Sequence, residues 1–124
     1  MMASKYSRDI NSQRAVSAAP FLAMLSDPDP IQEKQVYALR KIAQIVDYQW
    51  PEISDQLPRI EGLIDEDAFP EKQLAASIAS KVFYYLQEHD EALRLALEAG
   101  ESFNINAESQ YSETLVHKCI DLYI

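Results

Sequence analysis

Residues 74–100 constrain the fold of this chain more than any other stretch, because two helical patterns follow one another there with only a short polar link. In the first, apolar residues recur at i and i+4 on one helix face for about three turns: Leu74, Ala75, Ile78, Ala79, Val82, Phe83 and Leu86. The second pattern carries its own apolar side: Ala92, Leu93, Ala96, Leu97 and Ala99. Polar residues 88–91 separate the two, and Gly100 stands at the C′ position that ends a helix. A link this short predicts an antiparallel helical hairpin.

Small residues in this hairpin indicate how the rest of the chain is arranged. Ala75, Ala79 and Ala96 allow the two helix axes to approach closely. The hairpin cannot bury both of its apolar faces alone, so it needs neighbouring helices. We therefore predict an all-α fold of about six helices, arranged as stacked antiparallel hairpins in a right-handed, tetratricopeptide-like α-solenoid.

Composition agrees with a helical fold and narrows the classes of partner. The chain has 124 residues, the size of one domain, and only two glycines. Its net charge is −9, so phosphate backbones and anionic membrane surfaces would repel it. No apolar run approaches the ~20 residues of a membrane span. We expect neither nucleic acid nor membrane as a partner. The single cysteine, Cys119, cannot form an internal disulfide, which agrees with a reducing compartment.

The N-terminal part divides into an extension and the start of a helical rod. Residues 1–17 are polar without a visible period, and we interpret them as a flexible extension. The alternative is a segment that folds on a partner. Residues 18–124 form the predicted rod, which begins with a short helix over residues 18–25. The next helix is predicted over about residues 30–48, with Asp29 as its N-cap.

Prolines mark the next two helices. Pro51 is predicted to open a third helix, and Pro58 to kink or restart it, because proline removes a backbone hydrogen bond. The inner face of this helix is predicted to carry Ile53, Leu57, Ile60 and Ile64. A fourth helix starts at residues 69–70 and continues into the hairpin.

The last helix follows a loop over residues 102–110, in which Phe103 and Ile105 are expected to lie against the preceding helix. Asn106 or Ser109 is its predicted N-cap. Its apolar stripe consists of Tyr111, Leu115, Cys119 and Leu122. The pattern still runs at Ile124, which predicts that the chain is part of a longer protein.

Two features invite a ligand or metal interpretation. Trp50, the only tryptophan, is predicted to fill the gap between its helix and the next, with ligand stacking as the alternative. Asp65 and Asp67 have the spacing of a calcium loop, but Pro70 and Ala76 stand where such a loop needs glycine and a bidentate glutamate. A solvated acidic turn is therefore the preferred interpretation.

No pattern of catalytic residues is present. His89 lies in the polar turn, where an exposed loop is the simplest interpretation. His117 and Cys119 are two residues apart on a helix, so their side chains diverge and cannot act together. Cys119 is interpreted as a small core residue. We predict no catalytic residue, no cofactor-binding residue, no metal ligand and no enzymatic activity.

Several short segments resemble known families. Residues 82–86 and 90–93 resemble the turn of a tetratricopeptide repeat. A more extensive resemblance covers residues 18–123 and is carried by WPEIS at 50–54, ASKVFYYL at 79–86, FNIN at 103–106 and KCID at 118–121. In their order and spacing these segments resemble the N-terminus of the non-ATPase regulatory subunit 1 family of the 26S proteasome.

This resemblance implies a function that could not be inferred from the chemistry of individual residues. Members of the family are long α-solenoids in which an N-terminal helical rod leads into a ring of short helical repeats. They are non-catalytic scaffolds for ubiquitin-dependent protein degradation, in cytoplasm and nucleus. Their implied partners are the ATPase base, the lid and the ubiquitin receptors of the regulatory particle.

Two further possibilities stay open. One is a free-standing peptide-binding adaptor, which would need clustered cations on one face, whereas Lys72, Lys81, Arg94 and Lys118 are scattered among acids. The other is an enzyme, which the lack of any nucleophile–base or metal spacing disfavours. A separate hypothesis is that the isolated chain self-associates, because an open solenoid end leaves part of its apolar seam uncovered.

Overall fold

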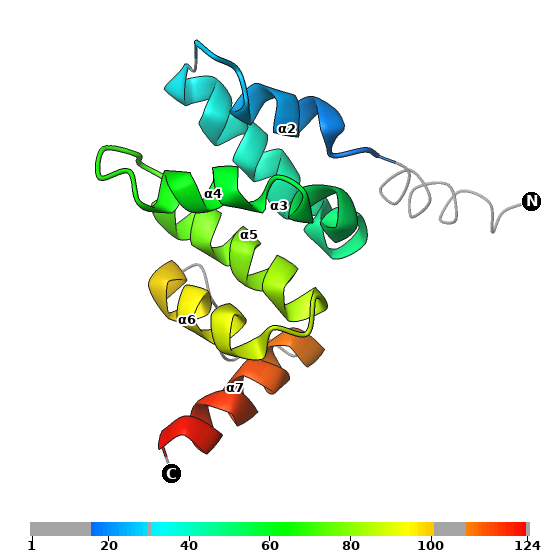
Figure 1. The fold of residues 1–124 in the computed structure, drawn as a ribbon, viewed down its shortest axis with the longest axis vertical. Coiled ribbons are helices and arrows are strands. Elements are labelled where there is room, and N and C mark those ends of the chain that lie inside the picture. Colours follow the sequence, from blue (N-terminus) through cyan, green and yellow to red (C-terminus); the bar gives the residue numbers. More distant parts are fainter. Residues whose placement is uncertain (1–15, 30, 101–108, 124) are drawn as a thin grey trace, which may run out of the picture.

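The computed structural model describes residues 16–29, 31–100 and 109–123. Within this part there is no strand, so the predicted all-α class is confirmed. The helices shown in Figure 1 are α2 (Ala19–Leu25), α3 (Gln32–Ser54), α4 (Leu57–Ile64), α5 (Lys72–Tyr85), α6 (His89–Ala99) and α7 (Gln110–Tyr123). The predicted extension lies mostly outside the described residues, and its boundary at residue 17 stays a prediction.

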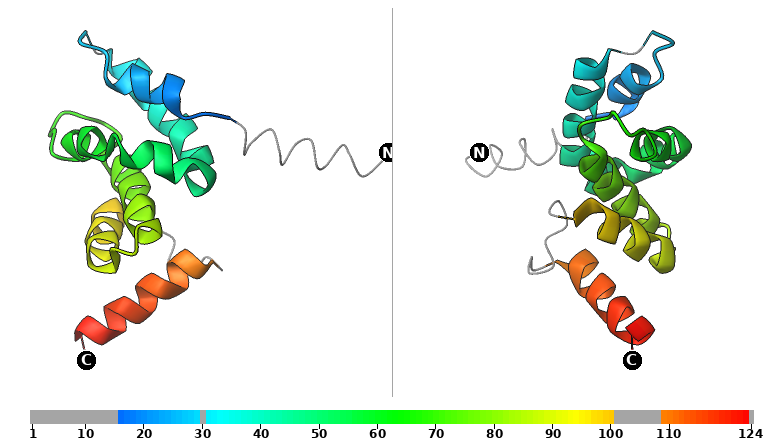
Figure 2. Two further views of the ribbon diagram at one scale, coloured as in Figure 1. Left: turned by 45° about the vertical axis from the view of Figure 1, so that its right-hand side comes forward. Right: turned by 90° about the vertical axis from the view of Figure 1, so that its left-hand side faces the viewer.

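The helices stack one after another along the long axis of the molecule, as in a solenoid (Figures 1 and 2). Helix α2 packs on α3, both α3 and α4 pack on α5, α5 packs on α6, and α6 packs on α7. The predicted hairpin is α5–α6, which is the most extensive helix pair. Ala75, Ala79 and Ala96 are fully buried, as expected for small residues where two helices approach closely.

The buried side chains form two clusters along this stack. The larger extends from α2 to α6, and its fully buried members include Leu39, Ile42, Ile60, Ile78 and Leu95. The smaller surrounds Leu115 of α7 and joins that helix to α6. The cores therefore follow the stack instead of meeting at one centre, as stacked helical repeats require.

Helix α3 begins differently from the prediction, but it contains the predicted helix start at Pro51. Its N-cap is Ile31, which makes no side-chain cap, so the predicted Asp29 cap is wrong. Asp27 instead accepts a hydrogen bond from the Asp29 amide at 3.0 Å, which turns the chain before the helix. The backbone leaves helical geometry at Gln49 (φ −113°, ψ 19°), next to the predicted helix end at residue 48, so α3 consists of two helical segments joined by a kink. Pro51 lies in the first turn of the second segment, where its missing N–H is not needed.

Of the two effects predicted for Pro58, a kink or a new helix, the structure has the new helix. Helix α3 ends at Ser54, and α4 begins at Leu57 with Pro58 in its first turn. Leu57 and Ile60 are buried as predicted, but Leu63 is buried where Ile64 was expected, and Ile64 is only half-buried. Because a new helix starts at Leu57, its buried side is rotated relative to that of the preceding helix. An apolar stripe continued from Ile53 with a single helical period therefore predicts Ile64 as buried in place of Leu63.

The buried side of helix α6 differs in part from the predicted one. Leu97 was placed on the buried side, yet it is 58% exposed, whereas Leu95 is buried. The buried arc is centred on Ala92, Ala96 and Ala99. Leu97 lies five residues after Ala92, about 140° around the helix, and falls beyond that arc. Leu86 is likewise exposed, because α5 has already ended at Tyr85.

The ends of the last two helices agree with the prediction where they are described. Gly100 has φ +58°, a backbone conformation that glycine adopts without strain, at the C-terminus of α6. Ser109 caps α7, since its Oγ accepts a hydrogen bond from the Ser112 amide at 3.1 Å. Phe103, Ile105 and Asn106 lie outside the described residues.

The turn between α5 and α6 depends on Gln87, a residue that the sequence analysis did not single out. Gln87 has φ +67°, the left-handed conformation. Its amide donates to the Tyr84 carbonyl at 3.0 Å, and the Glu88 amide donates to the Phe83 carbonyl at 2.9 Å. This pair of bonds is a Schellman motif, which normally has glycine at the left-handed position. Helix α6 then starts at His89, earlier than predicted.

We expect Gln87→Gly to raise the free energy of unfolding by about 1 kcal/mol, because glycine relieves the left-handed strain. The matched control is Gln44→Gly at an exposed position inside α3. This substitution should lower the free energy of unfolding by about 0.5–1 kcal/mol. Urea denaturation followed by circular dichroism measures both. Equal destabilisation by the two substitutions would contradict the role assigned to Gln87.

Candidate interaction surface

The residues considered for catalysis do not come together in the structure. His89 is half-buried at the start of α6 and stacks on Tyr84 with ring centroids 6.0 Å apart, so its interpretation as an exposed loop residue is wrong. His117 is exposed on α7. Cys119 is half-buried against the cluster around Leu115, a more peripheral position than the core one predicted.

The acidic turn shows no metal-binding geometry. Asp65 and Asp67 are exposed, and Asp67 lies 3.5 Å from the Lys72 ammonium. Nowhere in residues 16–29, 31–100 and 109–123 do three His, Cys, Asp or Glu side chains gather closely enough to hold a metal ion. The absence of catalytic, cofactor and metal residues stays a prediction for the whole chain.

Trp50 contacts a different helix from the one expected. Its ring stacks on Tyr85 of α5, with centroids 5.6 Å apart and an interplanar angle of 11°. The expected position was the gap between its own helix and the next. The kink at Gln49 immediately precedes Trp50, and α3 packs on α5, so the indole meets an α5 ring.

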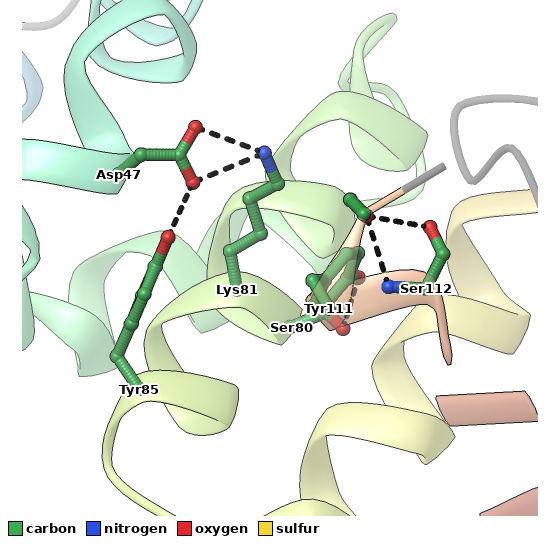
Figure 3. A network of polar contacts seen from close by, with 7 residues as sticks. Asp47, Ser80, Lys81, Tyr85, Tyr111 and Ser112 are labelled. Carbon is green, nitrogen blue, oxygen red and sulfur yellow. Dashed lines mark hydrogen bonds and ion pairs between the residues drawn. The ribbon is translucent and has the colours of Figure 1, made fainter. Parts of the chain in front are cut away.

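Figure 3 shows a polar network in which Asp47 of α3 contacts Lys81 and Tyr85 of α5. The Asp47 carboxylate accepts hydrogen bonds from Lys81 Nζ at 3.2 and 3.3 Å. It also accepts one from the Tyr85 hydroxyl at 2.7 Å. Burial raises the pKa of Tyr85 above its ordinary value, and the bond to Asp47 raises it further. The network therefore keeps Tyr85 neutral while it joins two helices far apart in sequence.

A second set of contacts continues this connection to α6 and α7. The Ser80 hydroxyl is buried, donates to the Ala92 carbonyl at 2.6 Å and lies 2.7 Å from the Tyr111 hydroxyl. Lys81 Nζ lies 5.6 Å from the centroid of the Tyr111 ring. Burial raises the pKa of Tyr111, while the Ser80 bond opposes that shift. Sequence analysis missed Ser80, because a serine inside an alanine-rich stripe carries no signal of a distant partner.

We expect Asp47→Asn to lower the pKa of Tyr85 part of the way towards its ordinary value of about 10, since burial remains. The stacked Trp50 reports this ionisation, because tyrosinate quenches a neighbouring indole. Fluorescence quenching should therefore begin at lower pH in Asp47→Asn than in the unaltered chain.

The same shift has a consequence for stability. A tyrosine pKa raised by folding stabilises the fold below about pH 10, and this contribution is lost as the pH rises through the folded-state pKa. Asp65→Asn, a change at an exposed carboxylate, is the control and should leave the quenching curve unchanged. Identical curves for both variants would contradict the assigned network, provided that circular dichroism shows each to be folded.

An outward-facing stripe of α3 is the other notable surface feature. Its members recur with alternating spacings of three and four residues along one side of the helix: Lys34, Tyr37, Lys41, Gln44 and Tyr48. Tyr37 is 49% exposed and Tyr48 is 44% exposed. We call these five residues the α3 stripe. The sequence analysis did not single out these residues.

Tyr37 stands between two hollows of this surface. One, of about 270 Å³, is lined by Val16, Phe21, Tyr37, Lys41, Gln44 and Ile45. The other, of about 340 Å³, is lined by Gln32, Glu33, Val36, Tyr37, Arg40 and Pro70. The Tyr37 ring packs edge-on against Phe21 with centroids 6.4 Å apart, and Lys41 Nζ lies 5.6 Å from its centroid.

The sequence is similar to that of one family along almost its whole length. A family model described as "26S proteasome subunit RPN2, N-terminal domain" matches residues 16–124. The 26S proteasome non-ATPase regulatory subunit 1 of Drosophila melanogaster is 47% identical over 108 residues, which are 87% of this chain and 10% of that protein. The 26S proteasome regulatory subunit rpn2 of Schizosaccharomyces pombe is 46% identical over 114 residues, 92% of this chain and 12% of that protein.

The Saccharomyces cerevisiae protein named 26S proteasome regulatory subunit RPN2 is 44% identical over 108 residues, 87% of this chain and 11% of that protein. The chain thus spans only about a tenth of the length of these curated relatives. Among the helices of the described residues, none has the length and apolarity needed to cross a membrane.

Proposed function

Because this chain belongs to the family of the N-terminal domain of 26S proteasome subunit RPN2, we propose that it is a non-catalytic scaffold segment of the proteasome regulatory particle. It would support ubiquitin-dependent protein degradation through protein–protein contacts. The observation that carries the proposal is the identity of 44–47% to proteins named as proteasome regulatory subunits, maintained over nearly the whole chain.

The architecture supports this role physically. Successive helices bury their faces against one another along the stack, and side-chain networks join α3 to α5 and α5 to α7. Such a stack can hold surfaces at fixed separations, because each helix is positioned by its neighbours. The proposed partners are the ATPase base, the lid and the ubiquitin receptors of the particle, in cytoplasm and nucleus.

The test is affinity purification of the full-length parent protein from its own cells, followed by quantitative mass spectrometry. We expect ATPase and lid subunits in amounts close to that of the purified protein. Recovery of chaperones or one client protein without proteasome subunits would contradict the proposal. That result would favour the free-standing peptide-binding adaptor.

A deletion tests the contribution of this segment itself. The parent protein without residues 16–124 is purified in parallel, and its total amount is matched to that of the intact protein. We expect a loss of those subunits that contact the segment. Unchanged recovery of every subunit would show that the scaffold role belongs to other parts of the parent protein.

A further inference from the structure

We propose that the α3 stripe is the docking surface for an acidic amphipathic helix of a neighbouring protein. The inference rests on the proposed scaffold role for its biological setting, but the surface can be tested by itself. Three observations carry it: the local charge, the exposed aromatic residues beside apolar hollows, and the spacing of the stripe.

The charge of the α3 stripe is opposite to that of the chain. The net charge of the chain is −9, whereas the stripe carries two cations, Lys34 and Lys41, and no carboxylate. Among the described residues, the other cations are mostly paired with carboxylates. Arg40 is paired with Glu71 at 3.1 Å, whereas Lys34 and Lys41 have no ion pair with any described residue. An acidic segment would be attracted here and repelled from most of the remaining surface.

The aromatic residues provide the apolar part of the surface. Tyrosine is enriched among the residues that dominate binding energy at protein interfaces. Tyr37 is exposed, held edge-on by Phe21, and bordered by a hollow on each side. These hollows can accept apolar side chains that project from one face of a bound helix.

The direction of the α3 stripe fits a helix as the occupant. Its residues follow one side of α3 with alternating steps of three and four, so a helix aligned with α3 can contact several of them along its length. A partner helix aligned with α3 would place apolar residues beside Tyr37 and Tyr48. Its flanking carboxylates would then meet Lys34 and Lys41, whose long side chains can adjust to them.

The experiment measures binding of a synthetic probe to the 124-residue chain by fluorescence anisotropy. The probe is a labelled peptide of about three heptads with Leu at a and d and Glu at e and g, where repulsion between glutamates opposes self-pairing. We expect saturable binding that weakens as salt is added. Tyr37→Ala should weaken binding of the peptide at least about tenfold. Tyr37→Phe keeps the aromatic ring and should therefore bind the peptide as the unaltered chain does.

Charge reversal provides the decisive comparison. Lys34→Glu combined with Lys41→Glu should weaken binding of the Glu peptide at least about tenfold. A peptide with Lys at e and g should in turn bind this double variant better than it binds the unaltered chain. Arg59→Glu, an exposed cation on α4, is the control and should leave binding of the Glu peptide nearly unchanged.

Circular dichroism confirms that each variant is folded before binding is measured. Equal binding of the Glu peptide to the unaltered chain and the double variant would overturn the proposal. So would equal binding of the Glu and Lys peptides to the unaltered chain, or no binding at millimolar concentration. None of these outcomes bears on the proteasome proposal, which depends on the purification of the parent protein.

Discussion

Replacing Ile42 by Ala is expected to lower the free energy of unfolding by about 2–5 kcal/mol, a large part of the total stability of a small domain. Ile42 is fully buried on α3 and belongs to the cluster that joins α3 to α5. Its truncation removes apolar area and leaves a cavity that rigid neighbouring helices fill only in part. Urea denaturation followed by circular dichroism and by Trp50 fluorescence measures the loss.

The control for this substitution is the same chemical change on the surface. Ile31→Ala alters a side chain that is 51% exposed at the N-cap of α3, and its effect should stay within about 0.5 kcal/mol. Similar effects of the two substitutions would contradict the assignment of the core. If Ile42→Ala is unfolded without denaturant, Ile42→Val provides a smaller measurable loss of about 0.5–1.5 kcal/mol.

Replacing Ala79 by Leu is expected to destabilise the chain by about 1–3 kcal/mol through overpacking. Ala79 is fully buried in α5 and belongs to the larger cluster, which extends from α2 to α6. A larger side chain must therefore shift a helix or adopt a strained rotamer. Differential scanning calorimetry should show a lower Tm.

Ala23→Leu is the matched control for Ala79→Leu. Ala23 is exposed on α2, and leucine has nearly the helix propensity of alanine, so little change is expected. A stability gain in Ala79→Leu would mean that the packing around α5 leaves more space than the buried alanines indicate.

Local features of the sequence predicted several elements correctly. The polar link and Gly100 located the hairpin, since both act on the backbone within one or two turns. Pro58 predicted a kink or a helix restart, because its missing donor and its ring act on adjacent residues, and the structure has the restart. Ser109, one of the two predicted caps, starts α7 through a bond that is equally local. The segments that resemble the proteasome subunit family also led to the family that the comparisons establish.

Features that depend on partners far along the chain were not predicted. Leu97 continues an apolar pattern, yet only the position of α5 and α7 around α6 decides that it is exposed. Asp29 is a plausible N-cap by type, but the chain turns before the helix, so that the Asp29 amide donates to Asp27 and α3 begins after Ile31. The α3 stripe was missed because its polar and aromatic residues do not form an apolar pattern in the sequence.

By itself, the sequence determined the helical class, the position of the hairpin and the family, because hydrogen bonds within a helix join residues only about four positions apart. Only the tertiary structure decided which sides of the helices are buried and which side chains meet. Asp47 and Lys81 are 34 residues apart, and Ser80 and Tyr111 are 31 apart. Such pairs form only after the helices have stacked, since packing sets their distance and orientation.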